Sequence, residues 1–146
     1  MLADFIERKR MTVTEQIARL KLHSRSSSSE AELKKIEELS GLALSSSFRE
    51  LWSAVGECIV GAKIRSGIQA GQNVCEFWGA GKIVEKLDED RLSHVVPFGE
   101  DIWGNWFFID ETGSIKLVDW NSNRVEPVSA SFDQFLESLD PLDRWR

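Results

Sequence analysis

Few residues in this chain combine the types and the spacing that catalysis or metal binding requires. His23 and His94 lie far apart in the sequence, and 16 residues separate Cys58 from Cys75, so no compact zinc-ligand pattern is present. No serine, cysteine or lysine lies at a recognisable spacing from a general base. We therefore predict no catalytic residue, no metal ligand and no cofactor.

Two weaker patterns have ordinary explanations. The segment 79–82 (Gly-Ala-Gly-Lys) is followed by Ile83 instead of the Ser or Thr that a phosphate-binding loop needs, so it predicts a turn. The chain has 24 Asp and Glu residues, so carboxylates that are close in sequence are expected without any role as general acids. An enzyme that acts on a small ligand is therefore our third-ranked hypothesis.

The distribution of charge disfavours nucleic acid as a partner. The chain has 18 Lys and Arg against 24 Asp and Glu, a net charge of −6, and a surface of this sign repels phosphate. Residues 1–29 hold six basic and three acidic residues, whereas residues 30–146 hold 12 basic and 21 acidic ones, a net charge of −9. An acidic surface of this kind serves either solubility alone or the binding of a basic protein partner.

The six tryptophans, with no tyrosine, are a second unusual feature of the composition. Indole side chains are large apolar groups that fill cores and also dominate binding hot spots. Trp103 and Trp120 each lie beside a turn and beside acidic residues. We expect either an interface or a packing role for these two side chains.

Residues 106–109 are apolar on both faces of an expected strand. Because side chains alternate along a strand, Trp106 and Phe108 point to one face and Phe107 and Ile109 to the other. Such a strand is either covered on both sides or belongs to a sheet that leaves one face for a partner.

The elements that position these residues begin with helices. Apolar residues recur at helical spacing between Leu2 and Leu20, which predicts one or two helices there. The serine-rich segment 24–29 is the clearest break in composition and predicts a loop or hinge.

Two capping boxes predict the next two helices. Ser29 with Glu32 opens a helix that ends at Gly41. Ser47 with Glu50 opens another, which ends at the following glycine.

The rest of the chain favours strands and one final helix. Residues 57–81 are rich in glycine, which predicts short strands and irregular loops. Ser131 with Gln134 forms a third capping box, opening a helix that includes Leu139 and stops at Pro141. Four apolar runs bounded by turn residues predict antiparallel strands, the last three in a meander: 95–98, 106–109, 115–118 and 125–128. The expected fold is α+β, with helices packed on a mainly antiparallel sheet.

The sequence also predicts a cytoplasmic protein. Five of the first ten residues are charged, which leaves no apolar segment suited to a secretory signal. The longest apolar runs have four residues, whereas a membrane-spanning helix needs about 20. Two cysteines are too few for a disulfide framework, so we expect both thiols to be reduced.

Two segments carry a resemblance to a known family. In residues 36–52 a helix ends near a glycine and a second helix begins with an aromatic residue, and residues 95–139 hold a strand meander followed by a capped helix. The meander contains Pro97-Phe98-Gly99, Gly104, aromatic residues that end in Asp110, and then Asp119. In order and spacing these features resemble the SMI1/KNR4 family of the SUKH superfamily. Leu44-Ser45 and Gly104-Asn105 stand where that family usually has Leu-Pro and Gly-Asp.

The resemblance implies both architecture and function. It implies an SMI1/KNR4-like α+β domain over residues 29–146. Residues 1–28 are expected to form a helical extension, which has no counterpart in that family. Bacterial members are commonly immunity proteins that bind and neutralise a cognate toxin, often a nuclease, whereas fungal relatives act in cell-wall and signalling control. The chain is therefore expected to be a non-enzymatic immunity protein. The alternative is a regulatory scaffold.

The candidate partner-binding residues combine carboxylates with indoles. The acidic cluster 88–90 is either a solvated loop or a mimic of phosphate charge presented to basic residues of a toxin. The full set of candidates is Asp88, Glu89, Asp90, Glu100, Asp101, Trp103, Asp110 and Trp120. The partner is expected to be a basic toxin protein, with no nucleic acid and no membrane involved.

Overall fold

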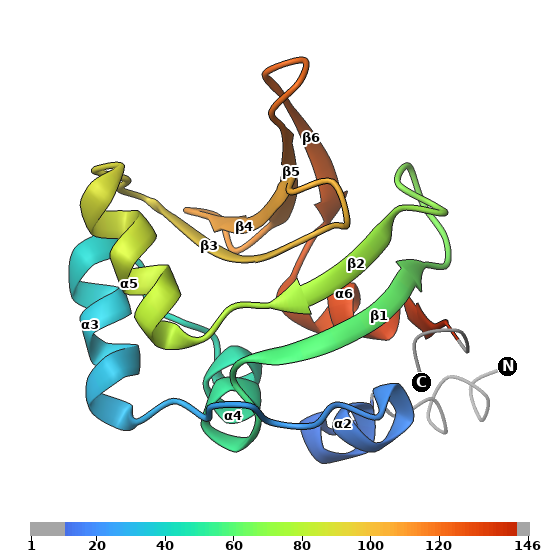
Figure 1. Ribbon diagram of the computed structural model, residues 1–146, viewed down its shortest axis with the longest axis horizontal. Helices are drawn as coiled ribbons and strands as arrows, with labels where there is room; N and C mark the ends of the chain where they lie inside the picture. The colour runs from blue at the N-terminus through green and yellow to red at the C-terminus, as the bar shows by residue number, and fades with distance from the viewer. Residues whose placement is uncertain (1–10, 143–146) are drawn as a thin grey trace, which may run out of the picture.

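Figure 1 shows the computed structural model of the protein, which describes residues 11–142. Over these residues seven strands form one antiparallel sheet in the order β6-β5-β4-β3-β2-β1-β7, and the sheet curls into a half-barrel. The strands are β1 (Cys58–Ile64), β2 (Asn73–Phe77), β3 (Val95–Glu100), β4 (Trp106–Asp110), β5 (Ile115–Asp119), β6 (Arg124–Ser129) and β7 (Leu139–Pro141). The helices are α2 (Val13–Leu20), α3 (Glu30–Ser40), α4 (Ser46–Ala54), α5 (Ala80–Glu89) and α6 (Phe132–Glu137). The α+β prediction is confirmed, as is the meander of β4, β5 and β6.

The predicted capping box at the start of α3 is confirmed. The Ser29 hydroxyl accepts from the Glu32 N–H, and the Glu32 carboxylate accepts from the Ser29 N–H. The helix ends at Gly41, whose φ of +76° is the left-handed conformation that glycine adopts without strain. A box of the same kind, Thr12 with Glu15, opens α2. The part of the first helix prediction that covers residues 1–10 lies outside the described residues.

Three details of the predicted elements were wrong. The cap of α4 is Ser45, which accepts from the Phe48 N–H, so the proposed box of Ser47 with Glu50 does not form. The start of α6 is only half of a box, because Ser131 accepts from the Gln134 N–H with no return bond recorded. Leu139 lies in strand β7 and not in the last helix.

The largest error concerns α5. Residues 79–82 were predicted as a turn and residues 88–90 as a loop, but Ala80–Glu89 forms one helix with Gly79 as its cap. Ile83 and Leu87 are buried on one face of this helix. Their burial against the neighbouring elements outweighs the cost of about 1 kcal/mol for a glycine such as Gly81 inside a helix.

The hydrophobic core lies on the inner face of the sheet, against α4 and α6. Trp52 and Phe48 of α4 stack with ring centroids 3.9 Å apart, and both meet Phe98 of β3 edge to face. The Trp52 indole N–H donates to the carbonyl of Trp78 at 2.9 Å. Figure 1 shows α3 and α5 side by side at one end of the sheet and α2 beside α4 along its lower side.

The alternation predicted for residues 106–109 distinguishes the two faces of the sheet. Phe107 is fully buried in the core, whereas Trp106 and Phe108 are only half-buried on the outer face. Of the two alternatives that the sequence left open, the structure therefore shows a sheet with one face accessible.

Two hydrogen-bonded contacts join segments of the half-barrel that are far apart in the sequence. The segment after α2 pairs with the residues just before β1 through a bridge between Ser26 and Gly56. Gly56 has φ of +64°, and an added Cβ would lie 2.3 Å from the Ser26 carbonyl oxygen. The Gln69 side chain, in the β1–β2 loop, donates to the Glu126 carboxylate of β6 at 2.6 Å. The second bond joins two parts of the sheet that lie far apart in strand order.

Candidate functional site

The outer face of the sheet carries an apolar groove of about 320 Å³. Of the described residues that line it, Asp90 alone is charged. The lining residues are Asp90, Leu92, Val95, Pro97, Trp106, Phe108, Val118, Trp120 and Val125. The groove therefore has an apolar floor and a carboxylate at one end, beside the end of α5.

Three indoles in contact form a row on this face. Trp78 meets Trp106 edge to face with centroids 5.0 Å apart, and Trp106 meets Trp120 in the same way at 5.1 Å. Lys82 lies over the Trp78 ring at 4.6 Å and Lys86 over the Trp106 ring at 5.6 Å. These two lysines are one helical turn apart on α5, so the helix fixes the first two indoles by cation–π contacts. Trp120, at the end of the row, is 49% exposed.

Three loops meet at the end of the sheet next to Trp120. The connections are β1–β2, β3–β4 and β5–β6, and hydrogen bonds join them. The Gln72 side chain donates to Asp101, the Ile102 N–H donates to the Asn73 side chain, and the Trp120 N–H donates to the Asn105 side chain. We call this region, residues 65–72, 101–105 and 120–123, the loop end.

Asp101 is the centre of that network. It is 2% exposed, and its two carboxylate oxygens accept from the Trp103 N–H, the Asn105 N–H, the Asn105 side chain and the Gln72 side chain. A carboxylate held in this way orders the backbone around it and does not face solvent. We therefore assign Asp101 to the support of Trp103 and leave it out of the proposed contact surface.

Replacement of Asp101 by alanine should destabilise the protein by about 2 kcal/mol or more, because four donors lose their acceptor. Urea unfolding followed by circular dichroism measures this loss. Asp119→Ala is the matched control, since the Asp119 carboxylate accepts from the Asn121 and Ser122 N–H groups in an exposed turn. It should cost about 0.5 kcal/mol. Equal losses in both variants would contradict the role assigned to Asp101.

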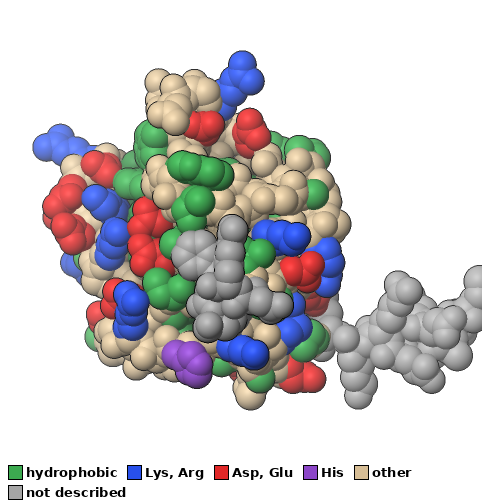
Figure 2. Space-filling view, turned by 45° about the vertical axis from the view of Figure 1, so that its right-hand side comes forward, with side chains coloured by type: hydrophobic (Ala, Val, Ile, Leu, Met, Phe, Trp, Pro, Cys, Tyr) green, Lys and Arg blue, Asp and Glu red, His purple; other side chains and the backbone are tan. Residues whose placement is uncertain are grey.

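The loop end presents apolar side chains to solvent. Ile68 is 83% exposed, Trp103 is 70% exposed and Ile102 is 45% exposed. Figure 2 is turned toward this end and shows hydrophobic side chains in the upper and middle part of the face, with acidic and basic ones beside them. Large apolar groups held on a hydrogen-bonded framework are typical of protein-binding surfaces.

The predicted acidic residues separate into three places. Asp88 and Glu89 form the last turn of α5 and Asp90 caps it, at the end of the groove. Glu100 pairs across the strands with Trp106 and accepts from the Trp78 indole N–H at 3.4 Å. Asp110 lies at the opposite end of β4, where it accepts from Thr112 and Ser114 and pairs with Lys116.

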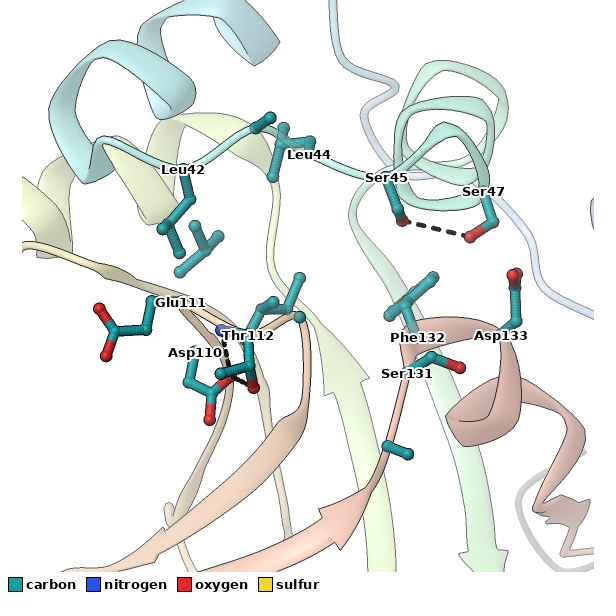
Figure 3. A pocket seen from close by; sticks show the side chains of 15 residues that line it. Leu42, Leu44, Ser45, Ser47, Asp110, Glu111, Thr112, Ser131, Phe132 and Asp133 are labelled. Carbon is teal, nitrogen blue, oxygen red and sulfur yellow. Dashed lines mark hydrogen bonds between the residues drawn. The ribbon is translucent and has the colours of Figure 1, made fainter.

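Asp110 belongs to a second hollow, shown in Figure 3, with a volume of about 370 Å³. The α3–α4 link, the β4–β5 turn and the start of α6 surround it, and Leu42 points into it. Its polar groups satisfy one another: Ser45 and Ser47 lie 3.3 Å apart between their hydroxyls, and the Thr112 hydroxyl donates to Asp110 at 2.6 Å. This hollow is remote from Trp103 and Trp120, because it lies at the other end of the sheet.

Sequence reasoning missed one indole of the row and both lysines that lie over it. Trp103 and Trp120 were identified from their positions beside turns. The alternation in β4 placed Trp106 with Phe108 on one face, and whether that face is accessible was left open. Trp78 and the two lysines were not identified, because their place depends on α5. The spacing of Lys82 and Lys86 carries the signal once that segment is treated as a helix.

The pKa of Cys58 has a structural explanation. Burial raises the pKa of the Cys58 thiol to about 12, which keeps it protonated and unreactive. Among residues 11–142 there is no group of three His, Cys, Asp or Glu side chains that could hold a metal ion. No helix in the same part of the chain is long and apolar enough to cross a bilayer.

The fold and this surface define a class of protein: an α+β domain with a curled antiparallel sheet whose outer face exposes aromatic side chains. Comparison with family models identifies the family. The model of the SMI1/KNR4 family (SUKH-1) matches residues 27–138, well over half of the chain, so the chain belongs to that family. Proteins of this family are generally non-catalytic immunity proteins of polymorphic toxin systems. Searches of curated proteins and of solved structures returned no match.

Proposed function

We propose that this protein is a cytoplasmic immunity protein that binds a cognate toxin and neutralises it by stoichiometric association. The observation that carries the proposal is the apolar groove on the outer sheet face, whose lining includes the Asp90 carboxylate and the half-exposed Trp120. Family membership supports the immunity role. All residues proposed to contact the toxin lie within residues 29–146, which we propose as the binding domain.

In the proposed mechanism the protein covers part of the toxin surface, and no covalent bond is made or broken in either protein. Trp120 and Trp103 serve as anchors that leave water on binding, and the toxin's active site or its access to substrate is covered. Aromatic anchors of this type supply most of the binding free energy of an interface, because they bury large areas at little cost in conformational entropy. Trp106 supports Trp120 from within the groove.

The acidic residues around the groove favour a toxin with a basic surface, such as a nuclease domain that binds phosphate. Asp88, Glu89 and Asp90 are exposed at one end of the groove, and Glu100 lies beside Trp106. Lys82 and Lys86 lie nearby, but both are engaged with indole faces. Carboxylates in such positions accelerate the encounter with a basic partner.

The triple change Asp88→Asn, Glu89→Gln and Asp90→Asn should lower the association rate about tenfold at low salt, with little effect on dissociation. Stopped-flow or surface-based kinetics at low and physiological ionic strength measures this, and the difference should shrink as salt screens the charges. The matched control is Glu38→Gln, Glu50→Gln and Glu111→Gln, three exposed glutamates outside the groove lining. If both triples slow association equally, net charge and not the acidic end of the groove is responsible.

Isolation of the native complex tests the function itself. The tagged full chain is purified from its own cells at low salt, and the bound proteins are identified and quantified. A single small basic protein at equal stoichiometry, whose toxicity the chain suppresses on co-expression, supports immunity. Several signalling proteins with no toxic activity would instead support a regulatory scaffold, the alternative function.

A further inference from the structure

Two glutamates face each other beside the indole row. Glu76 of β2 and Glu100 of β3 are register partners on adjacent antiparallel strands, and both are half-buried. Side chains directly opposite on one face lie about 5 Å apart at Cβ, so two ionised carboxylates here repel each other. The register of the strands, fixed by the core on the other face, prevents the pair from separating by a slip.

The surroundings of the two carboxyls are unequal. Glu100 has Lys82 at 3.7 Å and accepts from the Trp78 indole N–H. Glu76 faces Glu100 across the strands, and Glu100 has the largest effect on its carboxyl group. One ammonium and one indole N–H thus stabilise a negative charge on Glu100, while a second charge on Glu76 is opposed by Glu100 more strongly than any nearby cation favours it.

We infer that Glu76 and Glu100 share one proton near neutral pH, carried by Glu76, and that this proton makes the negative charge of the proposed binding surface depend on pH. The hydrogen bond to Glu100 raises the pKa of Glu76 to about 7, and burial adds to this shift. The same bond lowers the pKa of Glu100, with Lys82 acting in the same direction.

Other charged groups around the pair do not remove the imbalance. Arg25, in the segment before α3, and Lys82 of α5 both favour the ionised form of Glu76, but less than Glu100 opposes it. Lys86 of α5 lies over Trp106. Further titratable groups close to the pair or to its neighbours are Cys75 on β2, Cys58 on β1, Glu57 before β1 and Asp101 after β3, none of which adds positive charge.

Carboxyl-carbon NMR titration of the full chain tests the shared proton. In the wild-type protein one glutamate should titrate near pH 7, and assignment should identify it as Glu76. In Glu100→Gln the midpoint of Glu76 should fall by more than one pH unit, because the introduced side-chain amide carries no charge and can donate to the ionised form of Glu76. Glu111→Gln is the control and should leave the midpoint unchanged.

Two results would overturn the inference. One is a wild-type Glu76 that titrates in the ordinary range of glutamate. The other is a midpoint that stays near pH 7 in Glu100→Gln, which would assign the shift to burial alone. A preserved backbone spectrum in each variant shows that the comparison is made on the folded protein.

The pH dependence of the stability of the protein tests the shared proton independently. Because the folded-state pKa of Glu76 is raised, its stabilising contribution is complete below the unfolded value and is lost as pH rises through about 7. The denaturation midpoint of the wild-type protein should therefore fall between pH 5 and pH 8 more steeply than that of Glu76→Gln. Equal slopes in the two proteins would count against the shared proton.

The regulatory part of the inference rests on the proposed function. A basic toxin should bind the wild-type chain several-fold more tightly at pH 8 than at pH 6, whereas Glu76→Gln should lose most of that difference. The same affinity at both pH values, together with a Glu76 that titrates near 7, overturns the regulatory role but leaves the shared proton intact. If no toxin is found, the NMR titration still decides whether the proton is shared.

Discussion

Trp120→Ala is expected to raise the dissociation rate of the toxin complex about 30-fold or more, with little change in the association rate. Trp120 is half-exposed, stands at the end of an indole row and lines the groove with apolar neighbours. Truncation of an anchor in this setting typically costs about 2 kcal/mol or more of binding free energy. Surface-based kinetics with the toxin identified by native purification measures both rates.

Two variants make this result interpretable. Trp120→Phe retains an aromatic ring against Trp106 and should recover most of the affinity. Met11→Ala removes another exposed apolar side chain, 39% exposed and outside the groove lining, and should leave both rates unchanged. If Trp120→Ala binds as tightly as the wild-type chain, the groove is not the toxin-binding surface, whatever the function of the protein.

Trp52→Ala should have the largest effect on stability of any single change considered, a loss of about 3–5 kcal/mol. Trp52 is fully buried, stacks on Phe48 and donates its indole N–H to the Trp78 carbonyl. Domains of this size are stable by about 5–15 kcal/mol, so the variant should unfold at much lower denaturant or temperature. Chemical denaturation followed by circular dichroism checks this expectation.

A substitution at an exposed tryptophan provides the control for that measurement. Trp103→Ala removes an equally large side chain that is 70% exposed, and it should change stability by no more than about 0.5 kcal/mol. Trp52→Phe should fall between the two, because it keeps a ring against Phe48 but removes the hydrogen bond to Trp78. Similar losses for Trp52→Ala and Trp103→Ala would mean that the core and the exposed indoles are assigned wrongly.

Local sequence signals predicted elements where side chain and backbone interact within a few residues. Ser29 with Glu32 and Gly41 bounded α3 correctly, since a cap and a left-handed residue are determined by their neighbours. Helix α5 was missed because Gly79 and Gly81 suggested a turn. What stabilises that segment is the burial of Ile83 and Leu87 against distant elements, which no local pattern reveals.

In the candidate site, too, the sequence did not reveal contacts between distant elements. The exposure of Trp103 and Trp120 agrees with their positions beside turns, although their role in binding stays a prediction. Asp101 looked like a surface carboxylate in the sequence, yet it is buried beneath the loop end. Three of its four hydrogen-bond donors lie within four residues, in the same β3–β4 connection, but the fourth is Gln72 of the β1–β2 connection, which only the assembled sheet brings close.

The opposite orientation of Phe107 and its two neighbours in β4 has a consequence for how this scaffold can diversify. Phe107 anchors the strand from within, while its neighbours Trp106 and Phe108 face outward, so the two sets of side chains occupy different environments on the same backbone. Outward positions can therefore be exchanged between related chains without disturbing the interior. Under the proposed function, related chains can therefore adapt to different toxins by substitutions on the outer face of the sheet, while the core stays the same.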